Sequence, residues 1–445
     1  MSKSILLLNQ PPTNKRLYVN VLPPLGMLWV ASYLKSKGIE VKAIDGNVEV
    51  FDEKILYDYD IIAMSVGMAN IKKTIETVKS VKQNAPDKIF VCGGVYATQD
   101  PAYLLNNGFD AVVTGEGEIT FYEYVTQENK ENVKGLYLLK DGVPFFTGIR
   151  PKIMNLDEMP FPALEFVDLK KYKNPIGKKK PLSSIMTSRG CPHECIYCFH
   201  DRTFRVRSPE NVVDEIEWQV NKFGVKELCI IDDNFTLDLR RAERICDLII
   251  ERKIKVVMQC WNGIRVDRVT KSLLAKMKKA GIWMVAIAPE TGSEDTLLKI
   301  KKRFTLEQVR QARAWCKEVG IKTYSFFMIG FPWENKELIQ QTIDFANELD
   351  TEFTQFSRVY PMMGTELYED VKDQFQIERT DEGFFYGGSR VKVKGMDEEE
   401  VEKMVRKAYR SIYLKPRKMF QLMTTLKPNN LFELFKYSIL TRSIA

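Results

Sequence analysis

Two series of short apolar segments alternate with amphipathic helical segments, and this alternation limits the possible folds more than any other feature of the chain. In the first series, strand-like segments at 5–8, 41–45, 61–65, 89–91 and 111–114 are separated by patterns such as 25–36 and 71–83. Short apolar runs joined by helices are typical of buried parallel strands. Residues 1–148 are therefore expected to form a Rossmann-like, doubly wound parallel sheet, with a hairpin at Asp141-Gly142.

The second series has strand-like segments at 183–187, 228–231, 256–258, 284–287, 325–329 and 354–359. Helix starts between them are marked by Ser208-Pro209 and by the capping box that begins at Thr305. Six such units are too few for a complete eightfold barrel, so residues 181–365 are expected to form a partial (β/α)6 barrel. Residues 149–180, with four prolines, are expected to form a linker. Residues 366–445 are expected to be mostly helical.

The eight cysteines fall into two groups. No apolar run approaches the roughly 18 residues of a membrane-spanning helix, and the N-terminus lacks a signal-peptide pattern. A cytoplasmic location is therefore expected, where disulfides are rare. Five scattered cysteines read as small buried apolar residues: Cys92, Cys229, Cys246, Cys260 and Cys316. The other three, Cys191, Cys195 and Cys198, lie within eight positions.

The spacing CxxxCxxC, directly after the first strand of the second series, indicates a metal site. Three thiolates from one loop can ligate three irons of a 4Fe–4S cluster and leave the fourth iron open for a cosubstrate. The alternative is a zinc ion whose fourth ligand is His193 or His200. Zinc sites usually combine one C-x-x-C with a second, distant pair of ligands, and the sequence shows no such second pair.

This segment, with Tyr197 before the third cysteine, resembles the radical S-adenosylmethionine superfamily. The resemblance implies that Cys191, Cys195 and Cys198 ligate the cluster, and that the open iron binds S-adenosylmethionine. One electron from the cluster would then release a 5′-deoxyadenosyl radical. The resemblance also implies a set of cofactor-binding residues near the ends of the barrel strands: Tyr197, Phe199, Asp232, Asp233, Asn234, Glu290, Ile329 and Gly330.

Three of these sites also have a purely structural interpretation. Asp232-Asp233 could be a turn at a strand end, Glu290 could cap the next helix, and Gly330 could lie in a turn.

The N-terminal segment resembles the cobalamin (B12)-binding domain of one branch of the superfamily. The positions that carry this second resemblance, and that it implies contact cobalamin, are Pro24, Leu25, Gly26, Ser65, Val66, Gly67, Met68, Gly93, Gly94, Val95, Tyr96, Gly115 and Glu116.

Glycines after strands let a backbone approach a bulky ligand closely. The alternative is a domain of the same fold that binds no cofactor. The chain has two histidines, both in the cysteine loop, so no histidine of the N-terminal domain can be a lower cobalt ligand. Tyr96 stands where relatives often carry histidine, and it could be only a packed residue.

The resemblance implies a methyltransferase that acts on an unactivated carbon through the 5′-deoxyadenosyl radical and methylcobalamin. Alternatives are a cobalamin-dependent ring-forming or rearranging enzyme, and a non-catalytic iron–sulfur electron carrier. Expected partners are a small-molecule or lipid-like substrate and an electron donor such as flavodoxin or ferredoxin. Nucleic acid is not expected.

The net charge of +7 is concentrated at the C-terminal end. Residues 401–445 contain ten Lys or Arg and two acidic residues, a local charge of +8. Apolar residues are interleaved with these charges, a pattern of helices that lie in a membrane interface. The alternative is a helix that packs its apolar face on the barrel and leaves its charges in water. Peripheral contact with the inner face of a membrane is thus one hypothesis.

Overall fold

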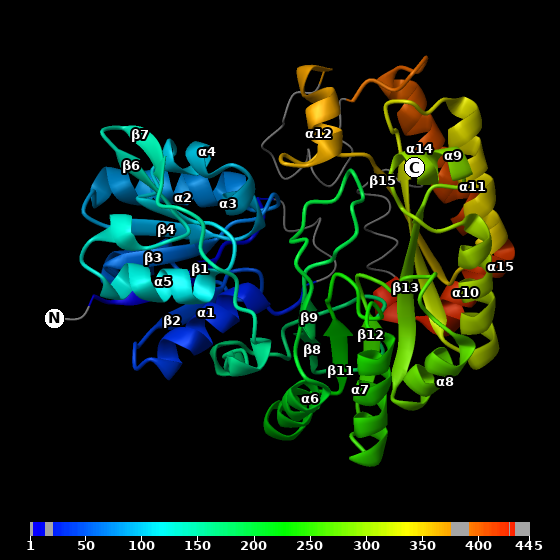
Figure 1. Cartoon of the computed structure of the whole chain (residues 1–445), viewed down its shortest axis with the longest axis horizontal. Helices are drawn as coiled ribbons and strands as arrows, with labels where there is room; N and C mark the ends of the chain where they lie inside the picture. The colour runs from blue at the N-terminus through cyan, green and yellow to red at the C-terminus, as the bar shows by residue number, and fades with distance from the viewer. Residues whose placement is uncertain (1–2, 14–20, 375–390, 427, 432–445) are drawn as a thin grey trace. The chain divides into compact units, whose positions relative to one another are not determined.

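The computed structural model describes residues 3–13, 21–374, 391–426 and 428–431. The chain divides into two compact units, with the boundary between Tyr172 and Lys173 (Figure 1). Residues 149–180, expected to be a linker, are therefore shared between the units. The part before Lys173 contains two 3₁₀ turns, Leu156–Glu158 and Leu164–Phe166.

Within the described residues of the first unit, seven strands form one sheet in the order β2-β1-β3-β4-β5-β6-β7. Strands β1 to β5 are parallel, and β6 and β7 form the expected antiparallel hairpin. The chain runs from β1 to β2 on one side and then to β3 on the other, so the order switches at β1. The elements are β1 Ile5–Asn9, α1 Leu25–Ser36, β2 Lys42–Asp45, β3 Ile61–Ser65, α2 Ile71–Asn84, β4 Ile89–Gly93, α3 Val95–Gln99, α4 Pro101–Leu105, β5 Ala111–Val113, α5 Gly117–Thr126, β6 Leu136–Lys140 and β7 Val143–Phe146.

In the described part of the second unit, six parallel strands follow one another in the order β8-β11-β12-β13-β14-β15, with helices on their outer side (Figure 1). This is the expected partial barrel, and the α/β fold class is confirmed. A short antiparallel pair, β9 and β10, lies outside this sheet. The elements are β8 Leu182–Ile185, β9 Ser188–Arg189, β10 Arg205–Val206, α6 Pro209–Phe223, β11 Glu227–Ile230, α7 Leu239–Glu251, β12 Val257–Cys260, α8 Lys271–Lys279, β13 Ile282–Glu290, α9 Glu294–Lys299, α10 Leu306–Val319, β14 Lys322–Ile329, α11 Lys336–Leu349, β15 Phe353–Arg358, α12 Glu366–Val371, α14 Glu398–Tyr413 and α15 Pro416–Thr425.

Helix α14 covers the exposed edge of the barrel sheet. The Tyr413 hydroxyl donates to the Thr354 carbonyl and accepts from its N–H, and Tyr409 bonds Phe356 in the same way. These hydroxyls pair backbone groups of the edge strand β15 that would otherwise face solvent. The apolar face of α14 is buried, so this helix follows the packing alternative. No helix of the described residues is both long and apolar enough to cross a bilayer.

Candidate active site

The cysteine loop is closed at its base by the pairing of β9 with β10. Gly190, the first residue of the loop, has a φ of +82°, and a Cβ placed there would lie 2.3 Å from the Thr203 carbonyl oxygen. The Cys191 N–H donates to the Asp201 carbonyl at 2.8 Å. Only glycine can bring the two ends of the loop this close.

The three thiols lie near enough to influence one another. Burial, together with the neighbouring Cys195 thiol, raises the pKa of Cys198 to about 12, and burial also raises the pKa of Cys191. Charge on these sulfurs therefore needs a cationic partner, and bound iron would supply one. Among the described residues, no three Cys, His, Asp or Glu side chains are arranged to hold a metal ion. A closed mononuclear zinc site requires four ligands around one point, whereas a 4Fe–4S cluster takes one cysteine per iron.

A buried network fixes the loop between its second and third cysteines. The Tyr197 hydroxyl donates to Glu290 Oε1 at 2.9 Å, and the Lys302 ammonium donates to both groups, at 2.9 Å to the hydroxyl and 2.8 Å to the carboxylate. Glu290 ends β13 with a φ of +69°, a strained conformation for a non-glycine residue. The network holds it there. Glu290 thus already has two partners, and sequence reasoning missed Lys302 altogether.

The two acidic residues after β11, Asp232 and Asp233, make different contacts. Asp232 is buried and accepts hydrogen bonds from the Thr187 N–H and hydroxyl and from the Ser188 hydroxyl, so it anchors the start of the loop. Asp233 is exposed and accepts from the Gly190 N–H at 3.1 Å. The negative charge of Asp233 lies near the cysteines and contributes to the raised pKa values of Cys191 and Cys198.

Buried groups without partners lie near the same strand ends. Asn234 is 3% exposed, and its Nδ2 makes no hydrogen bond. The buried Nε2 of His193 in the cysteine loop has none either, and burial beside Arg265 lowers the pKa of that histidine to about 4. Unpaired buried donors are costly. They are the groups that a polar ligand such as adenosylmethionine would satisfy, so the donor set fits the cofactors expected here.

The loop after β14 is organised by Glu334, a residue that sequence reasoning also missed. Its Oε2 accepts from the N–H groups of Gly330 and Phe331, at 2.7 and 3.0 Å, while its buried Oε1 has no hydrogen bond. Ile329 is buried at the strand end. The Phe331 ring stands edge-on to Tyr197 at 6.2 Å between centroids, so this loop reaches the cysteine loop.

Phe199 is held from another direction. A Cβ on Gly364, whose φ is +80°, would lie 3.0 Å from the Phe199 ring. The Arg265 guanidinium donates to the Lys302 carbonyl and pairs with Asp267, which fixes the segment that carries the Lys302 side chain. The sequence-predicted residues of the barrel therefore gather at the carboxyl ends of its strands, where barrel enzymes build their sites.

In the first unit, the predicted residues also follow the carboxyl ends of strands. Gly94 has a φ of +112°, and a Cβ there would lie 2.8 Å from the Val66 carbonyl. This contact joins the ends of β3 and β4 and demands glycine. The close approach is completed by the Val66 N–H, which donates to the Gly93 carbonyl at 2.8 Å.

Other glycines at this edge have no structural reason to be glycine. At Gly26 and Gly67, which have no positive φ, an added Cβ would meet nothing within 4 Å. Such open backbone at the switch point of a doubly wound sheet fits a bulky ligand like cobalamin. Pro24 precedes α1, Ser65 ends β3, and Gly115 donates its N–H to the Thr98 hydroxyl.

Several predicted positions can offer little side chain to a ligand. Tyr96 is fully buried with its hydroxyl 3.5 Å from Asp100, which favours its packing role. Glu116 accepts from the Ile153 N–H at 2.9 Å. Leu25, Val66 and Met68 are buried, whereas Val95 is 56% exposed.

Two family models match the chain. The Radical SAM superfamily matches residues 185–346, and the B12 binding domain matches residues 16–125. An uncharacterized methyltransferase of Pyrococcus horikoshii is 32% identical over 93% of this chain and 93% of its own. An anaerobic magnesium-protoporphyrin IX monomethyl ester cyclase of Rubrivivax gelatinosus is 27% identical over 80% of this chain and 67% of its own.

The same architecture occurs in a solved structure, the radical S-adenosylmethionine methyltransferase TsrM of Kitasatospora setae with cobalamin and a [4Fe–4S] cluster bound. It is 17% identical with a TM-score of 0.71, over 97% of this chain and 92% of its own. Fold and site together define a radical enzyme built on a partial barrel. The chain belongs to the radical S-adenosylmethionine superfamily, in the branch that carries a B12 binding domain. Its cofactors are a 4Fe–4S cluster, S-adenosylmethionine and cobalamin.

Proposed function

We propose that this cobalamin-dependent radical enzyme transfers a methyl group to an unactivated carbon of a small molecule. One observation carries the proposal: a single chain holds a three-cysteine loop at the barrel strand ends and an open glycine edge at the switch point of a B12 binding domain. The relative similar over 93% of both chains is named a methyltransferase.

The residues of the chain would divide the work as follows. Cys191, Cys195 and Cys198 would hold the cluster, and Asp233 and Asn234 would face the methionyl part of adenosylmethionine. Tyr197 and Lys302 keep the loop in place. When bound, the cluster and adenosylmethionine supply one-electron chemistry, and cobalamin supplies a methyl carrier.

The test is anaerobic reconstitution with iron, sulfide and cobalamin, followed by incubation with a reductant and methyl-labelled adenosylmethionine. Formation of 5′-deoxyadenosine is expected, and mass spectrometry of extracts of the source cells should find a labelled product. A chain that forms no 5′-deoxyadenosine under these conditions would be a carrier of electrons rather than a radical enzyme.

The second candidate is ring formation, which the similarity to the monomethyl ester cyclase favours. The two reactions differ in the fate of the label. Methyl transfer places labelled carbon in the product, whereas ring closure consumes adenosylmethionine and leaves the product unlabelled.

Two partners belong to the same proposal. A flavodoxin or ferredoxin would supply the electron, and its binding should raise the rate of 5′-deoxyadenosine formation above that with a chemical reductant. A membrane would be contacted at the periphery through α15, since this helix exposes the apolar side chains Met419, Phe420 and Met423.

A further inference from the structure

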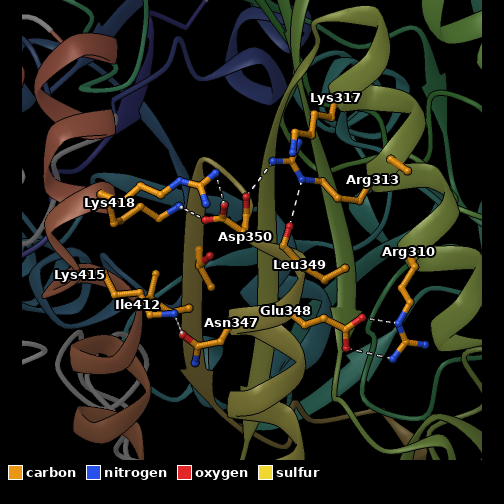
Figure 2. Close-up of a pocket in the computed structure, with 13 residues that line it drawn as sticks. Arg310, Arg313, Lys317, Asn347, Glu348, Leu349, Asp350, Ile412, Lys415 and Lys418 are labelled. Atoms are coloured by element: carbon orange, nitrogen blue, oxygen red, sulfur yellow. Dashed lines mark hydrogen bonds and ion pairs between the residues drawn. The ribbon is translucent and has the colours of Figure 1, made fainter.

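A basic pocket of about 500 Å³ opens at the amino ends of the barrel strands, between α10, α11, β15, α14 and α15 (Figure 2). Six cations and two carboxylates line it, so its net charge is +4. The cations are Arg310, Arg313, Lys317, Lys415, Arg417 and Lys418, and the carboxylates are Glu348 and Asp350.

The floor of the pocket is rigid. The Arg313 guanidinium is 8% exposed and donates to the carbonyls of Leu349 and Asp350, at 3.2 and 2.7 Å. The ammonium of Lys418, which is 4% exposed, donates to the Thr351 carbonyl and lies 3.5 Å from the Asp350 carboxylate. Burying two cations is unfavourable unless they are paired. Glu352 lies 3.5 Å from Arg313, and the carbonyls at the end of α11 accept from that guanidinium. Asp350 pairs with Lys418.

The rim of the pocket is not neutralised. Lys317 is exposed, and among the described residues its ammonium has no hydrogen bond or ion pair. Lys415 bonds only the neutral amide oxygen of Asn347, and Arg417, with its side chain 83% exposed, shares Asp350 with Lys418. Figure 2 shows Lys415 beside Asn347 and Lys418 beside Asp350. Three exposed cations around one concavity are suited to a phosphate group.

Exposed apolar side chains adjoin this rim in the same chain segment. Leu414 is 54% exposed, and Met419, Phe420 and Met423 of α15 are 51%, 65% and 57% exposed. A neighbouring face of α15 packs on the barrel, because Leu422 contacts the buried cluster around Trp283 and Leu426, directly after the helix, belongs to it. A helix that is held on one side and carries apolar and basic residues on the other has the composition of an interfacial helix.

We propose that the pocket binds the phosphate of an anionic phospholipid headgroup while Met419, Phe420 and Met423 enter the lipid. The inference rests on the peripheral contact proposed above and gives it a site. Negative headgroups complement the +4 pocket, and the adjoining apolar side chains distinguish a bilayer from a soluble phosphate ester. The pocket lies at the end of the barrel opposite Glu290 and Gly330, so the membrane anchors the enzyme and leaves the catalytic end free.

The experiment is sedimentation of the full-length protein with vesicles of phosphatidylcholine, with or without phosphatidylglycerol, at low and high salt. The pocket variant replaces Lys317, Lys415 and Arg417 by Gln. Its partition onto anionic vesicles should fall on the order of a hundredfold. The matched control replaces three exposed lysines on other elements by Gln: Lys222, Lys226 and Lys255. The control should bind like the parent, since none of these three lysines lines the pocket.

A second variant, Phe420→Asp with Met423→Asp, should lose the binding that persists at high salt. Equal partition of the pocket variant and the parent onto anionic vesicles would overturn the site. Equal binding of the parent to neutral and to anionic vesicles would also overturn it. Release of the parent from anionic vesicles by inorganic phosphate, beyond that by chloride at the same ionic strength, would support the site, because phosphate and headgroup would compete for it. Binding of inorganic phosphate that the pocket variant loses while its vesicle binding is unchanged would assign the pocket to soluble phosphate and overturn the lipid. Absence of vesicle binding by the parent would overturn the membrane contact itself. All variants should form 5′-deoxyadenosine at the parental rate, so these failures are separable from failure of the radical chemistry.

Discussion

The Lys302 ammonium lies 2.8 Å from Glu290 Oε1, and both side chains are about nine-tenths buried. The pair joins the strained end of β13 to Tyr197, which stands between two of the cysteines. An ion pair this deep mainly constrains geometry, because desolvation offsets much of its attraction. Its structural effect is to fix the loop that must present three thiols together.

Replacing Lys302 by Met should destabilise the protein by about 3–5 kcal/mol, because Glu290 would keep a buried charge without its cation. Iron retention and the reduction potential of the reconstituted cluster should both fall, the latter because a positive charge is lost nearby. Lys301→Met is the matched control. Its pair with Glu366 is exposed and contributes at most about 1 kcal/mol. Urea unfolding and iron content measure the difference, and equal losses in both variants would contradict a special role for Lys302.

Substitution of the three loop cysteines should have a different effect from substitution of the other five. Alanine at Cys191, Cys195 and Cys198 together should abolish the cluster, about four irons per chain, and all 5′-deoxyadenosine formation. Single alanine substitutions at the other five cysteines should each retain the iron, since those side chains are buried within the two units: Cys92, Cys229, Cys246, Cys260 and Cys316. A triple variant that still formed 5′-deoxyadenosine would refute the assignment.

Sequence reasoning reached the sheets, the strand ends and the cysteine loop because periodicity and spacing are local properties of the chain. It did not reach Lys302, Glu334 or Arg265, because their roles arise from contacts that fold closure creates. Lys302 meets Tyr197 across 105 positions of sequence. The same limit explains Asp232: its type and place suggested a ligand contact, but Thr187 and Ser188 already occupy its carboxylate.

Gly190→Ala should prevent closure of the cysteine loop, since its Cβ would overlap the Thr203 carbonyl at 2.3 Å. Gly224→Ala is the control: Gly224 also has a positive φ, +65°, but an added Cβ there would meet nothing within 4 Å. The control should lose only about 1–2 kcal/mol, the cost of the left-handed conformation. Iron binding after reconstitution should be lost in the first variant and retained in the second.

The buried carboxyl of Glu334 should make the unfolding free energy of the protein depend on pH. Burial raises its pKa to about 7, and the two backbone N–H groups offset this only partly. An acid whose folded pKa lies above its unfolded value contributes stability at low pH that is lost as the pH rises through the folded pKa. From about pH 4.5 to about pH 7, the unfolding free energy of the parent should fall relative to Glu334→Gln by on the order of 3 kcal/mol. The exposed Glu337→Gln should follow the parent, and parallel curves for all three proteins would contradict the buried acid.

The cobalamin edge can be tested without disturbing the fold. Gly26 lies in the first turn of α1 and is exposed, so Gly26→Leu should preserve stability or raise it by up to about 1 kcal/mol. The same side chain would fill the open space at the strand ends, and cobalamin affinity should drop at least about tenfold. Lys79→Leu, at an exposed position in the second half of α2, is the control and should bind normally.

No histidine of residues 1–148 can bind the cobalt, because this segment contains none. We also expect the cobalamin's own dimethylbenzimidazole to be displaced, which would give a base-off form. Electron paramagnetic resonance of the reduced cob(II)alamin form would report nitrogen hyperfine splitting if an axial base were present. Splitting in the parent would contradict the base-off state. Unchanged cobalamin affinity in Gly26→Leu would instead show that the ligand does not lie against Gly26, because the added side chain would then not meet it.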